Sequence, residues 1–225
     1  MKLKTTLILL LSFFTLFAQE KEFKRPDYKS IEKNINDSKS EFYYPVLMEK
    51  LVKHDTLITA DQYHHLYYGY VFNKNYAPYG SYSKRSELNE LLKKQELSKE
   101  DYAKVISMAE EALVQNPFDL GMMNLLAIFK DYNGESEEAQ KIAANMYGIL
   151  ETIVKSGDGK TCPTAYHVIS PHDEYAIMGT AGIRSLGQAL MGSCDLQRID
   201  EDEFGISKLF FDISKPFSQL SDSFK

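Results

Sequence analysis

A short segment in the last third of the chain carries acid, base and metal-ligating groups close together. His167 is followed by His172, Asp173 and Glu174. Because a strand and the turn after it can bring such side chains together, they could hold a metal ion or act as a general acid and base. Their spacing matches no recognised ligand motif, so the sequence favours a strand histidine and then a polar turn after Pro171. A small hydrolase or metal-dependent enzyme that uses this region is kept as an alternative.

The motifs of nucleophilic and phosphate chemistry are incomplete. The segment 182–187, Gly-Ile-Arg-Ser-Leu-Gly, has one residue too many for the sharp turn of a hydrolase elbow. Residues 157–160, Gly-Asp-Gly-Lys, are too few for a phosphate-binding loop and follow a helical pattern instead of a strand. Residues 200–203 lack the alternation and the glycine of a calcium loop. We therefore predict no catalytic residue, no metal and no cofactor.

Tyrosine is concentrated in one stretch, with seven of the 15 tyrosines between Tyr63 and Tyr82. On a helix, Tyr63, Tyr67 and Tyr70 would share one face. Since each ring has a flat apolar face and a polar hydroxyl, the stretch could form a surface that grips a peptide or a glycan. The predicted binding residues are Tyr63, Tyr67, Tyr68, Tyr70, Tyr76 and Tyr79. The alternative is that these rings pack the first helical hairpin against the loop 73–83.

Apolar residues recur at helical spacing over residues 41–156. The most informative part of this pattern comprises Ala109, Ala112, Leu113, Asn116-Pro117, Leu126-Ala127, Gly134 and Ala139. Small side chains let two helices approach closely, Pro117 stops one helix, and Gly134 allows the turn between the next two. The pattern resembles a tetratricopeptide-type helical hairpin. Stacked helix pairs of this kind are interaction surfaces more often than catalytic chambers.

Helix starts are indicated by two capping boxes, Thr59 with Gln62 and Ser98 with Asp101. Beyond residue 157 the pattern changes to short stretches typical of strands. These stretches are Tyr166–Ile169, Gln188–Met191, Asp195–Ile199 and Leu209–Ile213. We therefore predict an α+β protein, in which tetratricopeptide-like hairpins are followed by a small antiparallel β part over residues 157–225.

The N-terminus has the pattern of a secretory signal peptide. Lys2 and Lys4 precede an apolar run that ends at Ala18, where polar residues resume. We expect residues 1–18 to be removed, so that the mature chain is periplasmic or extracellular and is not inserted in a membrane. The polar residues 19–40 are predicted to form a tether that includes one short helix.

The two cysteines, Cys162 and Cys194, lie 32 positions apart. In a chain exported to an oxidising compartment, this pattern favours a disulfide between them. The alternative is two unpaired, partly buried thiols.

Three blocks of the sequence resemble one known family. They are Leu66–Phe72 with Tyr76 and Pro78-Tyr79, the pair Asn116-Pro117, and Lys208–Phe217. These blocks resemble domain of unknown function 4919, a Bacteroidetes family of secreted proteins. The resemblance covers nearly the whole mature chain. It implies an envelope or extracellular protein, and it brings no activity or catalytic residue with it.

These patterns together predict a non-catalytic module that binds a protein or peptide partner in the cell envelope. A glycan-binding accessory protein is the further alternative. The formal net charge of −6 disfavours nucleic acid as a partner, because a negative protein repels phosphate.

Overall fold

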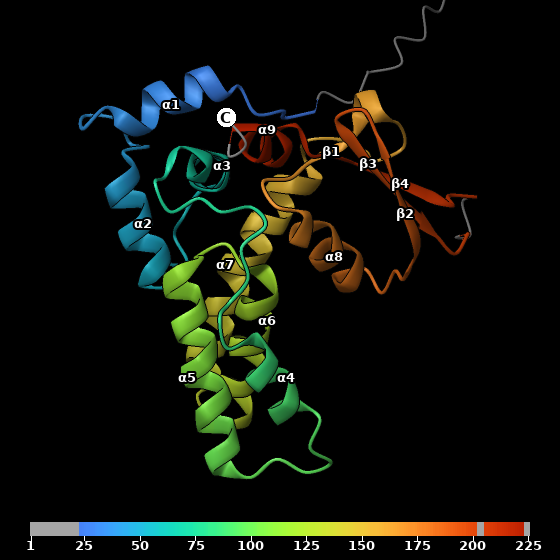
Figure 1. Cartoon of the computed structure of the whole chain (residues 1–225). Coiled ribbons are helices and arrows are strands. Elements are labelled where there is room, and N and C mark those ends of the chain that lie inside the picture. Colours follow the sequence, from blue (N-terminus) through green and yellow to red (C-terminus); the bar gives the residue numbers. More distant parts are fainter. Residues whose placement is uncertain (1–22, 202–204, 223–225) are drawn as a thin grey trace, which may run out of the picture.

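The computed structural model describes residues 23–201 and 205–222, and it combines helices with one small sheet (Figure 1). The helices are α1 (Tyr28–Asn36), α2 (Tyr44–Val52), α3 (Ala60–Gly69), α4 (Arg85–Leu92), α5 (Lys99–Gln115), α6 (Leu120–Tyr132), α7 (Ser136–Val154), α8 (Pro171–Thr180) and α9 (Ser214–Asp222), with 3-10 turns η1 (Tyr70–Phe72) and η2 (Cys162–Thr164). The strands are β1 (Tyr166–His167), β2 (Ser185–Met191), β3 (Cys194–Ile199) and β4 (Lys208–Asp212). The predicted α+β class is confirmed.

The predicted signal peptide, residues 1–18, lies outside the described residues. So do Asp202 and Glu203 of the acidic segment 200–203. In the part of the chain that is described, no helix is long and apolar enough to cross a bilayer.

Three long helices, α5, α6 and α7, run side by side and form the lower part of the molecule (Figure 1). α5 begins at the predicted capping box of Ser98 and Asp101, and Pro117 follows its end. The Asp119 side chain caps α6. Gly134 makes the turn into α7 with a φ of 86°, a conformation that favours glycine over residues with a Cβ atom. α5 packs against α6, and α6 packs against α7.

The segment 19–40, predicted as a tether with one short helix, contains the helix α1, which belongs to the core. The Asp27 side chain caps this helix by accepting a hydrogen bond from the Ser30 backbone N–H. Ile31 and Ile35 are 2% and 4% exposed, and α1 packs against α3. Two isoleucines four positions apart lie on one helix face, so they bury a narrow stripe in an otherwise polar sequence.

The C-terminal part contains a four-stranded sheet with the order β1-β4-β3-β2. β3 pairs antiparallel with both β2 and β4, but β1 pairs in parallel with β4. The prediction of a purely antiparallel part is therefore corrected to a mixed sheet. The chain between β1 and β4 contains α8 and a β-hairpin, so β1 reaches β4 through a long crossover instead of a tight turn.

α8 and α9 also lie in the segment that the sequence predicted as β-rich. Ser170 caps α8, with Asp173 completing a capping box and Pro171 at the first helical position. The prediction of a polar turn after Pro171 was wrong, although both features are signals for a helix start. α8 lies between α6 and the sheet (Figure 1), and its first turn faces α3 through Asp173.

Candidate functional site

The tyrosines predicted as a binding surface are mostly buried, because α3 packs against α1, α2 and α7. The buried members, which we call the α3 tyrosine cluster, are Tyr63, Tyr67, Tyr68, Tyr70 and Tyr76. Each is at most 9% exposed, so the interpretation of these five rings as an open surface is corrected. Their burial agrees with the alternative that these rings serve packing inside the fold. Among the six predicted residues Tyr79 alone is exposed, at 46%.

Hydroxyl groups of the α3 tyrosine cluster connect α3 to the segment that leads into α8. The Tyr67 hydroxyl donates to Asp173 Oδ2 at 2.6 Å and accepts from the Ile169 backbone N–H at 3.1 Å. The Tyr68 hydroxyl donates to the His167 carbonyl at 3.1 Å. Burial raises the pKa of Tyr67 well above its ordinary value, so the hydroxyl stays protonated. The cluster therefore joins the helical part to the C-terminal part.

Three carboxyl groups on α8 and β3 are buried, and two of them, Asp173 and Glu174, belong to the predicted acid–base region, whose burial the sequence did not indicate. Asp173, Glu174 and Asp195 are 2%, 0% and 4% exposed. Burial raises the pKa of Asp173 to about 7 and that of Glu174 to about 8, and it also raises the pKa of Asp195. Gln197 Nε2 donates to Glu174 Oε2 at 2.8 Å, and the Gln188 amide donates to Asp195. Burial therefore favours the protonated form of each of these acids.

The two histidines of the predicted acid–base region have different surroundings. His167 is half-buried on β1, with its Nδ1 3.8 Å from Asp212 Oδ2. Burial lowers the pKa of His167, which favours the neutral ring. His172 is exposed at the start of α8. Within residues 23–201 and 205–222, no three His, Cys, Asp or Glu side chains are grouped so that they could hold a metal ion. The buried acids bond instead to tyrosine and glutamine.

A disulfide joins Cys162 and Cys194, the pairing that the sequence favours. Their Cα atoms are 5.8 Å apart. The bond ties η2 to the first residue of β3 and so fixes the loop after α7 to the sheet.

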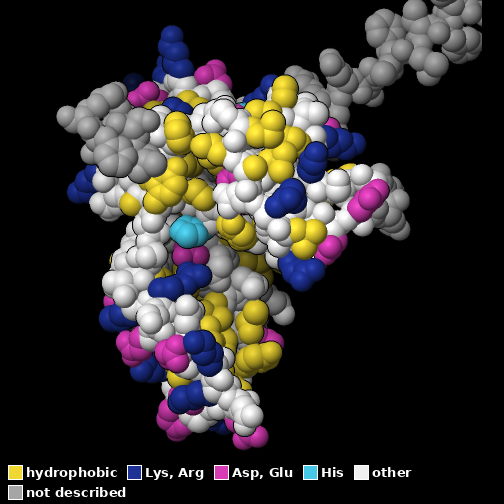
Figure 2. Space-filling model, turned by 45° about the vertical axis from the view of Figure 1, so that its right-hand side comes forward, with side chains coloured by type: hydrophobic (Ala, Val, Ile, Leu, Met, Phe, Trp, Pro, Cys, Tyr) yellow, Lys and Arg dark blue, Asp and Glu magenta, His cyan; other side chains and the backbone are white. Residues whose placement is uncertain are grey.

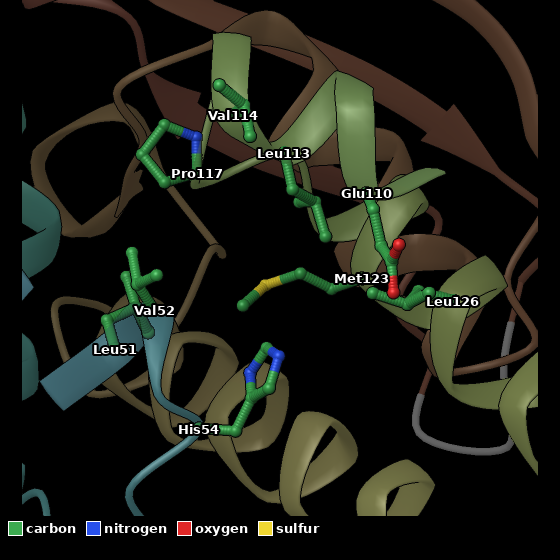
Figure 3. Close-up of a pocket in the computed structure, with 9 residues that line it drawn as sticks. All are labelled: Leu51, Val52, His54, Glu110, Leu113, Val114, Pro117, Met123 and Leu126. Carbon is green, nitrogen blue, oxygen red and sulfur yellow. The ribbon is translucent and has the colours of Figure 1, made fainter. Parts of the chain in front are cut away.

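An open apolar hollow lies between the C-terminal ends of α2 and α5 and one side of α6 (Figure 3). This α2–α5 groove has a volume of about 290 Å³, and it is lined by Leu51, Val52, His54, Glu110, Leu113, Val114, Pro117, Met123 and Leu126. Its floor is buried, since Leu51, Met123 and Leu126 are each 2% exposed. At its edges Val52 and Val114 are 66% and 85% exposed. Such a hollow can bury an apolar side chain of a partner.

Two ionisable side chains border the α2–α5 groove. The His54 ring points toward the Met123 side chain (Figure 3), and burial lowers the pKa of His54 so that the ring is neutral near pH 7. His54 Nδ1 is buried and has no hydrogen-bond partner in the described part of the chain. Glu110 Oε1 lies 3.2 Å from Lys130 Nζ, and the Glu110 side chain remains 52% exposed. The groove thus combines an apolar floor with one carboxylate at its edge.

Residues 29–221 match a protein family described as Domain of unknown function (DUF4919). The chain belongs to the DUF4919 family. This match confirms the family resemblance seen in the sequence. Comparisons with the curated proteins and with the solved structures find no match. Since the DUF4919 description assigns no activity, function has to be argued from the geometry of this chain.

Sequence reasoning missed the α2–α5 groove because its lining comes from three separate segments of the DUF4919 domain. One local signal existed. Val114 directly follows Leu113 and extends the apolar stripe of α5 beyond the face that packs on α6. When the apolar stripe of a helix is wider than the face that packs on its neighbour, part of the stripe remains for another contact.

Proposed function

We propose that the protein is a non-catalytic module that binds a protein or peptide partner through the α2–α5 groove. The observation that supports this is the pair of exposed valines, Val52 and Val114, which come from different helices and border one apolar hollow. Leaving such side chains in water is unfavourable, and covering them would gain roughly 25 cal/mol per Å² of apolar surface. A partner that fills the hollow and covers both valines would therefore bind mainly through the hydrophobic effect.

The groove also indicates the chemistry of the partner. Its volume of about 290 Å³ suits one or two bulky aliphatic or aromatic side chains, which would act as anchors. The half-exposed carboxylate of Glu110, which already pairs with Lys130, also favours a Lys or Arg beside the anchor. A neutral His54 adds no positive charge that would oppose such a residue.

We place this activity outside the cytoplasm, in the periplasm or the extracellular space. The signal-peptide pattern of residues 1–18 and the Cys162–Cys194 bond support this location, because disulfides persist in oxidising compartments. The net charge of −6 supports a protein partner over nucleic acid. We propose no membrane insertion for the mature chain.

Selection from a random peptide library displayed on phage tests the proposal. We expect enriched peptides to share a bulky apolar residue next to Lys or Arg. Val114→Asp and Val52→Lys should each abolish binding of these peptides, because a charge would enter the apolar edge of the groove. The matched controls are Val46→Lys on α2 and Val154→Asp on α7, which alter valines that are 49% and 45% exposed and lie outside the groove lining.

Circular dichroism of all four variants shows whether each one is folded. Peptides that bind the wild type and a folded Val114→Asp variant equally well would reject the groove as the binding surface. A library that yields no specific peptide would argue against peptide binding itself.

A further inference from the structure

A second hollow lies on another face of α6, between α6, α7 and α8. Two cavities of about 450 and 480 Å³ meet there. They share the lining residues Leu120, Gly121, Tyr175 and Ala176, so they are adjacent, and we call them together the α6–α8 cleft. Its lining differs entirely from that of the α2–α5 groove.

Two exposed tyrosines border the α6–α8 cleft. Tyr147 on α7 is 56% exposed, and Tyr175 on α8 is 49% exposed. The Tyr175 hydroxyl donates to Gln188 Oε1 at 2.8 Å, which holds this ring in place against β2. Unlike the rings of the α3 tyrosine cluster, these two rings offer accessible apolar surface with polar edges.

The rest of the α6–α8 cleft mixes apolar and polar surface, and its charges are of both signs. Asn124 and Thr180 line one cavity, while Arg85, Asp119 and His172 line the other. Arg85 Nη1 lies 3.7 Å from Asp119 Oδ2, so positive and negative charges are balanced inside the cleft. Figure 2 shows a histidine beside acidic and basic side chains on one face, between the upper part of the molecule and the lower helices. The cleft therefore presents both donors and acceptors.

We propose that the α6–α8 cleft binds a neutral oligosaccharide. A pyranose ring has an apolar C–H face that can stack on a tyrosine ring, and hydroxyl groups that both donate and accept hydrogen bonds. The exposed rings and the amide, guanidinium and carboxylate groups of the cleft match these two properties. A phosphate or nucleotide would instead need a site with a net positive charge. Each cavity is large enough for a small ligand, so the whole cleft suits more than one sugar unit.

Gly179 on α8 offers a way to fill the cleft without disturbing the fold. It lines the same cavity as Tyr147, and a Cβ atom built on it would meet no atom within 4 Å. A side chain at this position would therefore begin in open space at the cleft. Leucine also forms helices more readily than glycine does.

Isothermal titration calorimetry of the mature chain with four neutral oligosaccharides tests the proposal. The probes are cellohexaose, xylohexaose, mannohexaose and laminarihexaose. We expect at least one to bind, and Gly179→Leu and Tyr147→Ala to weaken that binding by roughly tenfold or more, since each removes ring contact or space. Tyr132→Ala, at a tyrosine that is 64% exposed and outside the cleft lining, should leave the affinity unchanged.

Two results would overturn the proposal. One is the absence of binding heat with all four oligosaccharides at millimolar concentration. The other is an affinity that folded Gly179→Leu and Tyr147→Ala variants leave unaltered. Neither result bears on peptide binding at the α2–α5 groove, which has separate lining residues.

Discussion

The α3 tyrosine cluster and the α2–α5 groove reverse the usual relation between side-chain polarity and burial. Tyr67 carries a hydroxyl and is 0% exposed, whereas the aliphatic Val114 is 85% exposed. α3 is enclosed by α1, α2 and α7, and the Tyr67 hydroxyl has partners inside the fold. Val114 instead borders an open hollow. In this molecule a binding surface is therefore identified by which elements cover it, and residue type alone is a poor guide.

Removing a ring from the α3 tyrosine cluster should have the largest effect. Tyr67→Ala is expected to lower the free energy of unfolding by about 3–5 kcal/mol, because it leaves a cavity and removes a hydrogen bond from Asp173. Thermal unfolding should show a fall in Tm of about 6–20 °C. Tyr147→Ala, at an exposed tyrosine, is the control and should change stability by no more than about 0.5 kcal/mol. Equal effects of the two variants would contradict the contrast between buried and exposed rings.

The buried acids beside the cluster should make stability depend on pH. The pKa of Glu174 rises from 4.5 to about 8 on folding, so the folded chain keeps a proton that the unfolded chain releases in this range. The contribution of this proton to the free energy of unfolding is fully present below about pH 4.5. It is lost as the pH rises through about 8, and the free energy of unfolding then falls by at most about 1.4 kcal/mol per pH unit. Glu174→Gln should flatten the decline, although Asp173 and Asp195, whose pKa values are also raised, will keep part of it.

Urea unfolding of the wild type and Glu174→Gln at several pH values from about 5 to about 8 checks this prediction. If the free energies of unfolding of the two proteins changed with pH in parallel, Glu174 would be ionised inside the fold.

Two helical glycines, one beside the packed cluster and one beside the open cleft, have different surroundings. A Cβ atom at Gly148 would lie 2.3 Å from the Tyr63 ring, so Gly148→Ala should destabilise the protein by about 1–3 kcal/mol. A Cβ atom at Gly179 meets no atom within 4 Å, so Gly179→Ala should stabilise it by about 0.5–1 kcal/mol through helix propensity. Chemical unfolding of both variants measures the difference. Changes of the same sign in the free energy of unfolding of the two variants would contradict the difference in their surroundings.

The smallest effect on stability is expected at the edge of the groove. Val114→Asp should change the free energy of unfolding by no more than about 0.5 kcal/mol, because the side chain is already in water. The same variant should abolish peptide binding. Thermal unfolding and peptide binding measured on one preparation give both values. A large loss of stability would mean that Val114 serves packing.

Most helices were predictable because their signals are local. The capping boxes at Thr59 and Ser98 stand where the sequence places them. α8 was missed although Ser170 and Pro171 mark its start, because the segment was interpreted by its ionisable residues. The mixed sheet depends on a crossover between segments more than 40 positions apart, which no local pattern reports.

The candidate sites were less predictable than the fold. Burial of Tyr67 depends on Ile169 and Asp173, which are 102 and 106 positions away. The α2–α5 groove likewise forms only when α2, α5 and α6 come together. Cys162 and Cys194 were identified as partners because the chain offers a single pairing.

Methyl-detected NMR with a library-selected peptide is the most direct test of the groove. With labelled Val, Leu and Met methyl groups, the account predicts that peptide addition shifts the signals of Val52, Val114 and Met123 and leaves that of Val46 in place. Shifts confined to methyl groups outside the α2–α5 groove would contradict it.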